Sequence, residues 1–188
     1  KHRTFAFFDA DTRFEDGIVV IGLSDPAALA ILSSRIHVHW CLECGGKRET
    51  RPRYNKTETF DPYPFPLIST DAENPEDVAR LERLRHLGRR LEQLRARILT
   101  SDAAPTLTML YNHLERRREA IHGDLPLTEA ERETHDRLLV PTLMELHDEI
   151  DRAALLAYGW DDLISALVPD VGGRPGATLP SEHKNDAQ

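Results

Sequence analysis

The chain has 188 residues, of which 40% are apolar, and its formal net charge is -8. This length accommodates one domain or two small ones, and the apolar content is ordinary for a folded protein. The negative charge argues against a protein coated in basic surface, so any contact with nucleic acid has to be local. No stretch reaches the roughly 20 apolar residues of a membrane-spanning helix, and the two cysteines cannot make a disulfide framework. We therefore expect a cytoplasmic protein without membrane contact.

The N-terminal part predicts short strands followed by a helix. Residues 5–8 and 18–23 are short apolar runs, rich in aromatic or β-branched side chains and separated by an acidic segment. Such runs are typical of a hairpin or of two neighbouring strands. Asp25 followed by Pro26 indicates a helix start, because aspartate caps helix N-termini and proline suits the first turn. Gly45 marks the latest plausible end of this helix.

Residues 53–66, with the sequence RYNKTETFDPYPFP, separate this part from a mainly helical one. Three prolines favour an extended backbone, so we expect a fixed, extended connector with Tyr63 and Phe65 on opposite sides. Around the start of the connector lies the densest basic run of the N-terminal half: Lys47, Arg48, Arg51, Arg53 and Lys56.

The C-terminal part predicts long helices. Apolar residues recur at spacings of three and four over residues 75–99, which indicates a long amphipathic helix, and the arginines between them alternate with carboxylates as on a solvated face. A shorter helix should end near Gly123. Thr128 and Glu131 form a capping box that opens another helix, kinked at Pro141 and antiparallel to the first.

These patterns together predict an α+β fold. A small α/β part occupies residues 1–68, and a mainly helical domain built on an antiparallel helical hairpin occupies residues 69–168. Residues 169–188 are rich in glycine, proline and polar side chains, which predicts a disordered tail.

The residues indicate no catalytic centre. His37, His39, Cys41 and Cys44 lie within eight residues, but on a helix His39 points away from the other three, so one segment cannot complete a tetrahedral zinc site. No glycine-rich loop follows a strand, so we expect neither a metal nor a nucleotide cofactor in this chain. The histidines of the helical part are expected to be exposed or capping: His113, His122, His135 and His147.

Four motifs in order carry a family resemblance: LSSRIHVHW, GG followed by RYNKTETFDPYPFP, LTMLYNHLE and LHDEIDRAALLAYGW. Together they resemble the C-terminal end of class I SAM-dependent DNA methyltransferases of the MmeI-like restriction-modification family, over roughly residues 1–165.

This resemblance implies that residues 1–68 close a DNA target recognition domain and that the helical domain follows it. The parent enzyme would transfer a methyl group from SAM to a DNA base, which we expect to be the N6 amine of adenine, after flipping the base into a pocket. The SAM-binding and catalytic motifs would lie upstream, so the chain itself has no catalytic residue. Its partners would be double-stranded DNA and the methyltransferase domain of the same polypeptide. Lys1 stands inside a strand lead-in, as at the start of an excised fragment.

Within this framework, eight residues are candidates for DNA contact. We expect the basic residues to bind phosphates: Arg48, Arg51, Arg53 and Lys56. Tyr54 and Asn55 are candidates for a base edge or a sugar, and Ser34 and Arg35 are second-rank candidates.

Two alternatives stay open. The basic side chains could pair with Glu43, Glu49 and Glu58 and merely hold the connector. Alternatively, the chain could be a helical protein–protein interaction module without DNA contact, in which the N-terminal half only contributes packing.

Overall fold

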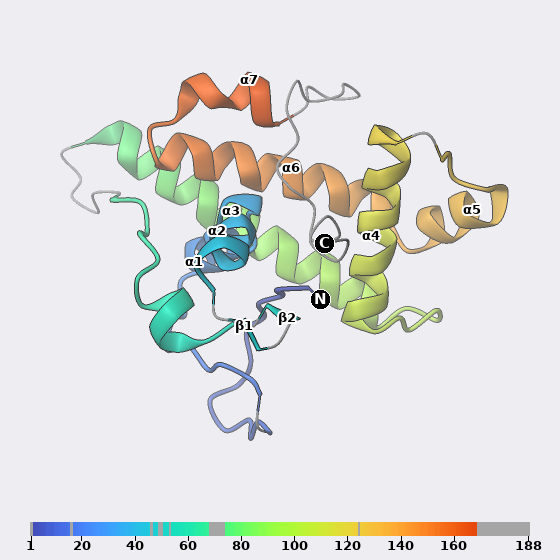
Figure 1. Cartoon of the computed structure of the whole chain (residues 1–188), viewed down its shortest axis with the longest axis horizontal. Coiled ribbons are helices and arrows are strands. Elements are labelled where there is room, and N and C mark those ends of the chain that lie inside the picture. The colour runs from blue at the N-terminus through green and yellow to red at the C-terminus, as the bar shows by residue number, and fades with distance from the viewer. Residues whose placement is uncertain are drawn as a thin grey trace.

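The computed structural model describes residues 2–15, 17–45, 47–48, 51–52, 54–67, 74–123 and 125–168, with the backbone alone for 47–48 and 51–52. The chain is mainly helical (Figure 1). Its elements in order are α1 (Pro26–Leu32), α2 (Arg35–Cys44), β1 (Lys47–Arg48), β2 (Arg51–Pro52), the π-helical turn η1 (Lys56–Phe60), α3 (Pro75–Leu99), α4 (Leu107–His122), α5 (Glu129–Arg137), α6 (Val140–Ala157), the 3-10 turn η2 (Asp161–Leu163) and α7 (Ile164–Leu167).

Helices α3 and α6 form the spine of the fold and run side by side in opposite directions (Figure 1). Their apolar stripes meet, so that Leu84, Leu91, Leu143 and Ile150 are fully buried. Proline at the first turn and an Asn74 cap start α3 where the sequence predicts it. The predicted long helix over residues 75–99 and its antiparallel pairing are therefore confirmed.

The ends of α4 and α5 also follow their sequence signals. Helix α4 ends at Gly123, and the capping box of Thr128 and Glu131 opens α5 as predicted. The expected kink at Pro141 is instead a complete break, in which Leu139 takes a left-handed φ of 52° and Pro141 falls in the first turn of α6. Proline in a helix interior would lose a hydrogen bond and clash with the preceding turn, so the helix restarts around it.

Two serines divide the first predicted helix. Asp25 caps α1, as predicted, but α1 stops at Ser33 and Ser34 caps α2 by accepting a bond from the His37 amide. Serine side chains compete for backbone hydrogen bonds, which makes them good helix boundaries. The corner they form lets α2 leave the direction of α1.

Helix α1 packs on α3 at unusually short range. A Cβ atom built on Gly88 of α3 would lie 2.0 Å from the carbonyl oxygen of Pro26. Beside this crossing Arg85 of α3 binds Asp25 with both its Nε and an Nη atom, at 3.0 and 2.8 Å. The hydrogen bond from Arg85 is the main reason why the pKa of Asp25 is lowered.

The predicted α+β fold is wrong. The only strands of the described residues are β1 and β2, which pair antiparallel over two residues each. Residues 5–8 and 18–23 run without regular secondary structure, because no neighbouring strand in the described part of the chain pairs with them. High β-propensity needs such a neighbour before it produces a sheet.

The connector is not fully extended either. Asn55 caps the turn η1, and the chain becomes irregular only from residue 61. Tyr63 and Phe65 lie on the same side, with their ring centroids 5.0 Å apart, and Tyr63 is buried. The hydroxyl of Tyr158 donates to that of Tyr63 at 2.8 Å, which ties the connector to the end of α6.

One apolar core runs through both predicted domains. The buried cluster contains Ala30 and Leu32 of α1 together with Leu87 of α3 and Leu146 of α6. The predicted disordered tail, residues 169–188, lies outside the described residues. None of the helices that the structure describes is long and apolar enough to cross a membrane.

The first prediction concerns the α1–α3 crossing. Replacing Gly88 with alanine should lower the free energy of unfolding by roughly 2–3 kcal/mol, because the new methyl group collides with rigid backbone. Urea unfolding followed by circular dichroism measures this change. Gly22→Ala is the matched control, since nothing lies within 4 Å of its Cβ position. Equal stability of both variants would mean that the two helices are not in this contact.

Candidate nucleic-acid interface

The basic run forms a small hairpin at the end of α2. Gly45 caps α2, and the following backbone places Lys47 opposite Pro52 and Arg48 opposite Arg51. The hairpin therefore brings two of the predicted phosphate-binding residues to one register position. Arg53, a third, lies outside the described residues.

Tyr54 fixes the chain directly after the hairpin. Its hydroxyl lies 3.4 Å from Nε2 of His37, a fully buried residue of α2. His37 Nδ1 lies 2.8 Å from the carbonyl oxygen of Leu32, which can only accept, so Nδ1 carries the proton and Nε2 accepts from Tyr54. Burial lowers the pKa of His37 to about 4, so the ring is neutral near pH 7. Tyr54 is thus an internal anchor for the hairpin.

The N-terminal segment completes this anchor. The ring of Phe5 packs against His37 and edge-on against Tyr54, with centroids 5.3 and 5.5 Å away. The carbonyl oxygen of Phe5 accepts a bond from Arg95 of α3 at 2.7 Å. Arg95 also donates to Tyr111, whose hydroxyl lies 2.8 Å from His147 Nε2. A buried polar chain therefore links the hairpin anchor to α3, α4 and α6.

Asn55 and Lys56 sit at the exposed start of the connector. The Asn55 side chain accepts from the Glu58 amide at 2.8 Å and donates to the Glu58 carboxylate at 2.7 Å. Lys56 pairs with Asp61 at 2.6 Å, and its side chain is 72% exposed. Exposed pairs of this kind contribute little stability. Lys56 can therefore change partners at small cost, whereas Asn55 maintains the turn.

Ser34 and Arg35 lie inside the fold. Ser34 is fully buried and donates to the carbonyl of Ile31. Arg35 binds Asp151 with its Nε at 2.5 Å and its backbone amide at 2.7 Å, and it binds Asp148 at 3.0 Å. These contacts assign Arg35 to the joint between α2 and α6. Its contact with DNA stays an untested prediction that would require this joint to open.

The arginines of α3 mostly meet carboxylates, as predicted for a solvated face. Arg83 and Arg90 both bind Glu149 of α6, and Arg80 pairs with Glu76 and Asp77 within its own helix. Arg95 is the exception because it is 5% exposed. The prediction that the histidines are exposed or capping is wrong for two of them, since His135 and His147 are buried.

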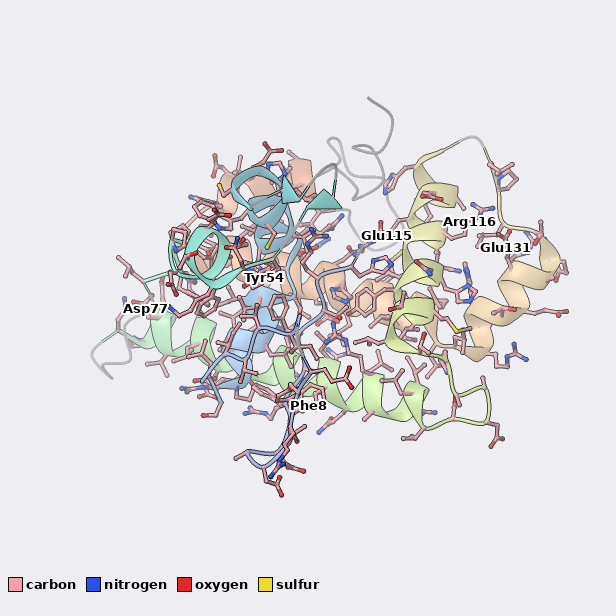
Figure 2. The ribbon with its side chains drawn as sticks, turned by 60° about the horizontal axis from the view of Figure 1, so that its bottom comes forward. Phe8, Tyr54, Asp77, Glu115, Arg116 and Glu131 are labelled. Carbon is pink, nitrogen blue, oxygen red and sulfur yellow. The ribbon has the colours of Figure 1, made fainter. Side chains whose placement is uncertain are left out.

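Arg116 links α4 to α5 and to the loop between them. Figure 2 shows Arg116 of α4 facing Glu131 of α5, and their Nε and Oε1 atoms lie 2.8 Å apart. Arg116 also donates to the carbonyls of Leu125 and Pro126, so one side chain holds the α4–α5 loop. The hydrogen bond from Arg116, with smaller contributions from Thr128, lowers the pKa of Glu131 to about 2.

Two of the four possible zinc ligands of α2 lie close together. Cys41 Sγ lies 3.6 Å from His37 Nε2, but Cys44 is exposed and the described residues hold no group of three or more possible ligands. Sequence reasoning missed three partly buried pairs: Arg35–Asp151, Arg95–Phe5 and Tyr54–His37. Only Gly88 carried a local signal, since a glycine inside an amphipathic helix often marks close packing.

Comparison with protein families gives one match: residues 1–67 fit the family model described as MmeI, target recognition domain. The predicted resemblance to this family is thereby confirmed over these residues. The match ends directly after the connector, before the start of α3 at Pro75. No curated protein and no solved structure matches the chain.

The geometry of Arg35 yields a prediction about stability. Arg35→Met should lower the free energy of unfolding by about 3 kcal/mol, because it leaves the buried Asp151 carboxylate without its cation. Arg83→Met, which breaks an exposed pair with Glu149, should cost less than about 1 kcal/mol. Chemical unfolding of both variants tests the difference. If Arg35→Met unfolds like the unaltered chain but binds DNA more weakly, Arg35 is a DNA contact instead.

The burial of His37 yields a prediction about pH. The unfolded chain binds a proton at His37 below its usual pKa of about 6.5, whereas the folded chain does so only near 4. The unfolded state therefore binds more protons between these values, so the contribution of His37 to stability falls as the pH drops from 6.5 towards 4. NMR titration of the His37 ring should show a midpoint near 4. A midpoint near 6.5 would contradict its burial.

Proposed function

We propose that the chain is the DNA-contacting end of a target recognition domain in a restriction-modification enzyme, with the helical half as its platform. The observation that carries this proposal is the basic hairpin β1–β2, which lies within the residues that match the MmeI target recognition domain. The hairpin would bind the phosphate backbone and set the register in which neighbouring residues meet the bases.

The register of the hairpin supports this role. Arg48 and Arg51 are paired residues, with Lys47 beside them. Like charges at directly opposite positions of an antiparallel pair are unfavourable in the absence of counter-charges. A polyanion would remove the repulsion. DNA, with one negative charge per roughly 1.7 Å of helix axis, is the polyanion that a target recognition domain meets.

The surroundings of the hairpin support it as well. The hairpin leaves the capped end of α2 and returns to the partly buried Tyr54, so both its ends are fixed on the helical body. Preorganisation of this kind reduces the ordering entropy of binding. Lys56, close behind Tyr54, can exchange its exposed partner Asp61 for a phosphate.

We infer further that the hairpin serves a reaction carried out on another part of a longer polypeptide. In this scheme an upstream domain binds SAM and methylates the N6 amine of an adenine flipped out of the duplex. The present chain would only hold and orient the DNA. It would act in the cytoplasm, where the DNA is. The competing hypothesis is that the helices dock another protein and that the chain does not contact DNA. The following test distinguishes the two.

The test is the salt dependence of DNA binding. The chain should bind a labelled 30-base-pair duplex in fluorescence anisotropy, with an affinity that falls as salt rises. Replacing Arg48 and Arg51 together with alanine should reduce the slope of log affinity against log salt by about 1.8, since each lost phosphate contact removes about 0.9.

The matched control replaces two arginines of the helical half, Arg83 and Arg132, which pair with Glu149 and Glu129. This double variant removes the same charge and should leave the slope unchanged. Equal slopes for both double variants would refute the hairpin contact. Self-association without any DNA binding would favour the protein-docking alternative.

A further inference from the structure

Trp160 is an exposed aromatic residue that the fold fixes in place. It follows the end of α6, in the turn that leads through η2 to α7 at the outer edge of the molecule (Figure 1). Trp160 is 42% exposed. Single exposed apolar residues are common, so exposure alone identifies no site. Trp160 differs from them because both its backbone and its ring are held.

The backbone of Trp160 is fixed by the way in which α6 ends. The amide of Gly159 donates to the carbonyl of Leu156 at 3.1 Å. The amide of Trp160 donates to the carbonyl of Leu155 at 2.9 Å. These two bonds, with Gly159 at a left-handed φ of 71°, form the Schellman ending of an α-helix. Main-chain hydrogen bonds therefore set the position of Trp160 on α6.

The ring of Trp160 is fixed by a second aromatic ring. It stacks on Tyr158, with the ring centroids 4.7 Å apart and an angle of 17° between the planes. Tyr158 is itself held, because its hydroxyl donates to that of the buried Tyr63. A ring that is already ordered loses little conformational entropy when a partner binds. Trp160 therefore presents a preformed aromatic surface to the solvent.

The charges that follow this ring in the chain are negative. Asp161 and Asp162 are both exposed, and neither forms an ion pair with another residue that the structure describes. Residues 153–168 contain no lysine, arginine or histidine. Such a surface repels the phosphates of a nucleic acid. A second copy fits poorly as well, because it would bring the same carboxylates on a chain whose net charge is -8.

A guanidinium group matches both the ring and the carboxylates. It is planar and weakly hydrated, so it stacks on aromatic faces, and its N–H groups bind carboxylates in a forked geometry. The ammonium group of lysine is compact and strongly hydrated, so it matches less well. Tryptophan and arginine are also the residue types that contribute most to protein–protein interfaces. The chemistry therefore favours an arginine of a protein partner.

We propose that the turn at residues 158–163 is a docking site for an arginine-bearing segment of another protein. The guanidinium group stacks on Trp160 and pairs with Asp161 or Asp162, and apolar parts of the segment pack on Leu163, which is 39% exposed. None of these residues belongs to the hairpin β1–β2 or to the connector. The inference therefore holds whether or not the hairpin binds DNA.

NMR titration of the 188-residue chain with a short peptide of alternating glycine and arginine tests the proposal. The indole N–H signal of Trp160 should shift and saturate. The signal of Trp40 should stay in place, since its indole N–H already donates to the carbonyl of Thr59. A peptide with neutral citrulline in place of arginine should bind roughly fivefold more weakly, because it loses the cation–π attraction. Equal binding of the two peptides would contradict recognition of a guanidinium group.

Substitutions locate the contact. Asp161→Asn with Asp162→Asn should weaken binding of the arginine peptide roughly threefold and leave the melting temperature unchanged, because both side chains are exposed. The matched control, Glu133→Gln with Asp136→Asn, removes the same charge from exposed positions of α5 and should leave the affinity unchanged. Equal weakening by the two double variants would refute the site. Trp160→Leu should weaken binding roughly fivefold, and if that variant fails to fold, the carboxylate variants still decide.

Two further measurements check the other occupants. Duplex DNA that shifts the indole signal of Trp160 more than the peptide does would make nucleic acid the ligand. A dimer in sedimentation velocity that Trp160→Leu dissolves would identify a second copy of the chain. Either result would overturn the proposal, whereas a monomer whose Trp160 signal responds only to the arginine peptide supports it.

Discussion

The backbone contact between Pro26 and Gly88 determines how the N-terminal and helical halves are joined. Because residue 88 has no side chain, α1 lies against the main chain of α3, and Ala27 and Ala30 of α1 are buried in the core. Contacts at this range orient two helices more strictly than long, adaptable side chains do. The ion pair of Asp25 with Arg85 closes one side of the crossing. The direction of α2, and with it the position of the hairpin, follows from this contact.

The unit that folds is therefore larger than the unit that matches a family. The family match ends at residue 67, but the core continues from α1 into α3 and α6. Arg35 reaches Asp151 of α6, and Tyr63 of the connector meets Tyr158 at the end of the same helix. The residues that match the recognition domain and the helical half thus share one hydrophobic interior.

Local signals in the sequence located the helices well, because caps and prolines act within a few residues. The Asp25 cap, the Gly123 stop and the capping box at Thr128 lie where they were predicted. The predicted sheet failed, since strand formation depends on partners that a local pattern cannot supply. Of the candidate site, the basic run was visible in the sequence, but the antiparallel pairing of β1 and β2 was not predicted. The inward role of Arg35 was not predicted either, because Asp151 lies 116 residues away in the sequence.

The two ends of the hairpin have one more consequence. Gly45 closes α2 through its own backbone, and Tyr54 is held by a histidine that belongs to the helix and not to the hairpin. Both attachments belong to residues outside β1 and β2. A hairpin of another length or composition could therefore be grafted between Gly45 and Tyr54 without changing the contacts that hold its two ends.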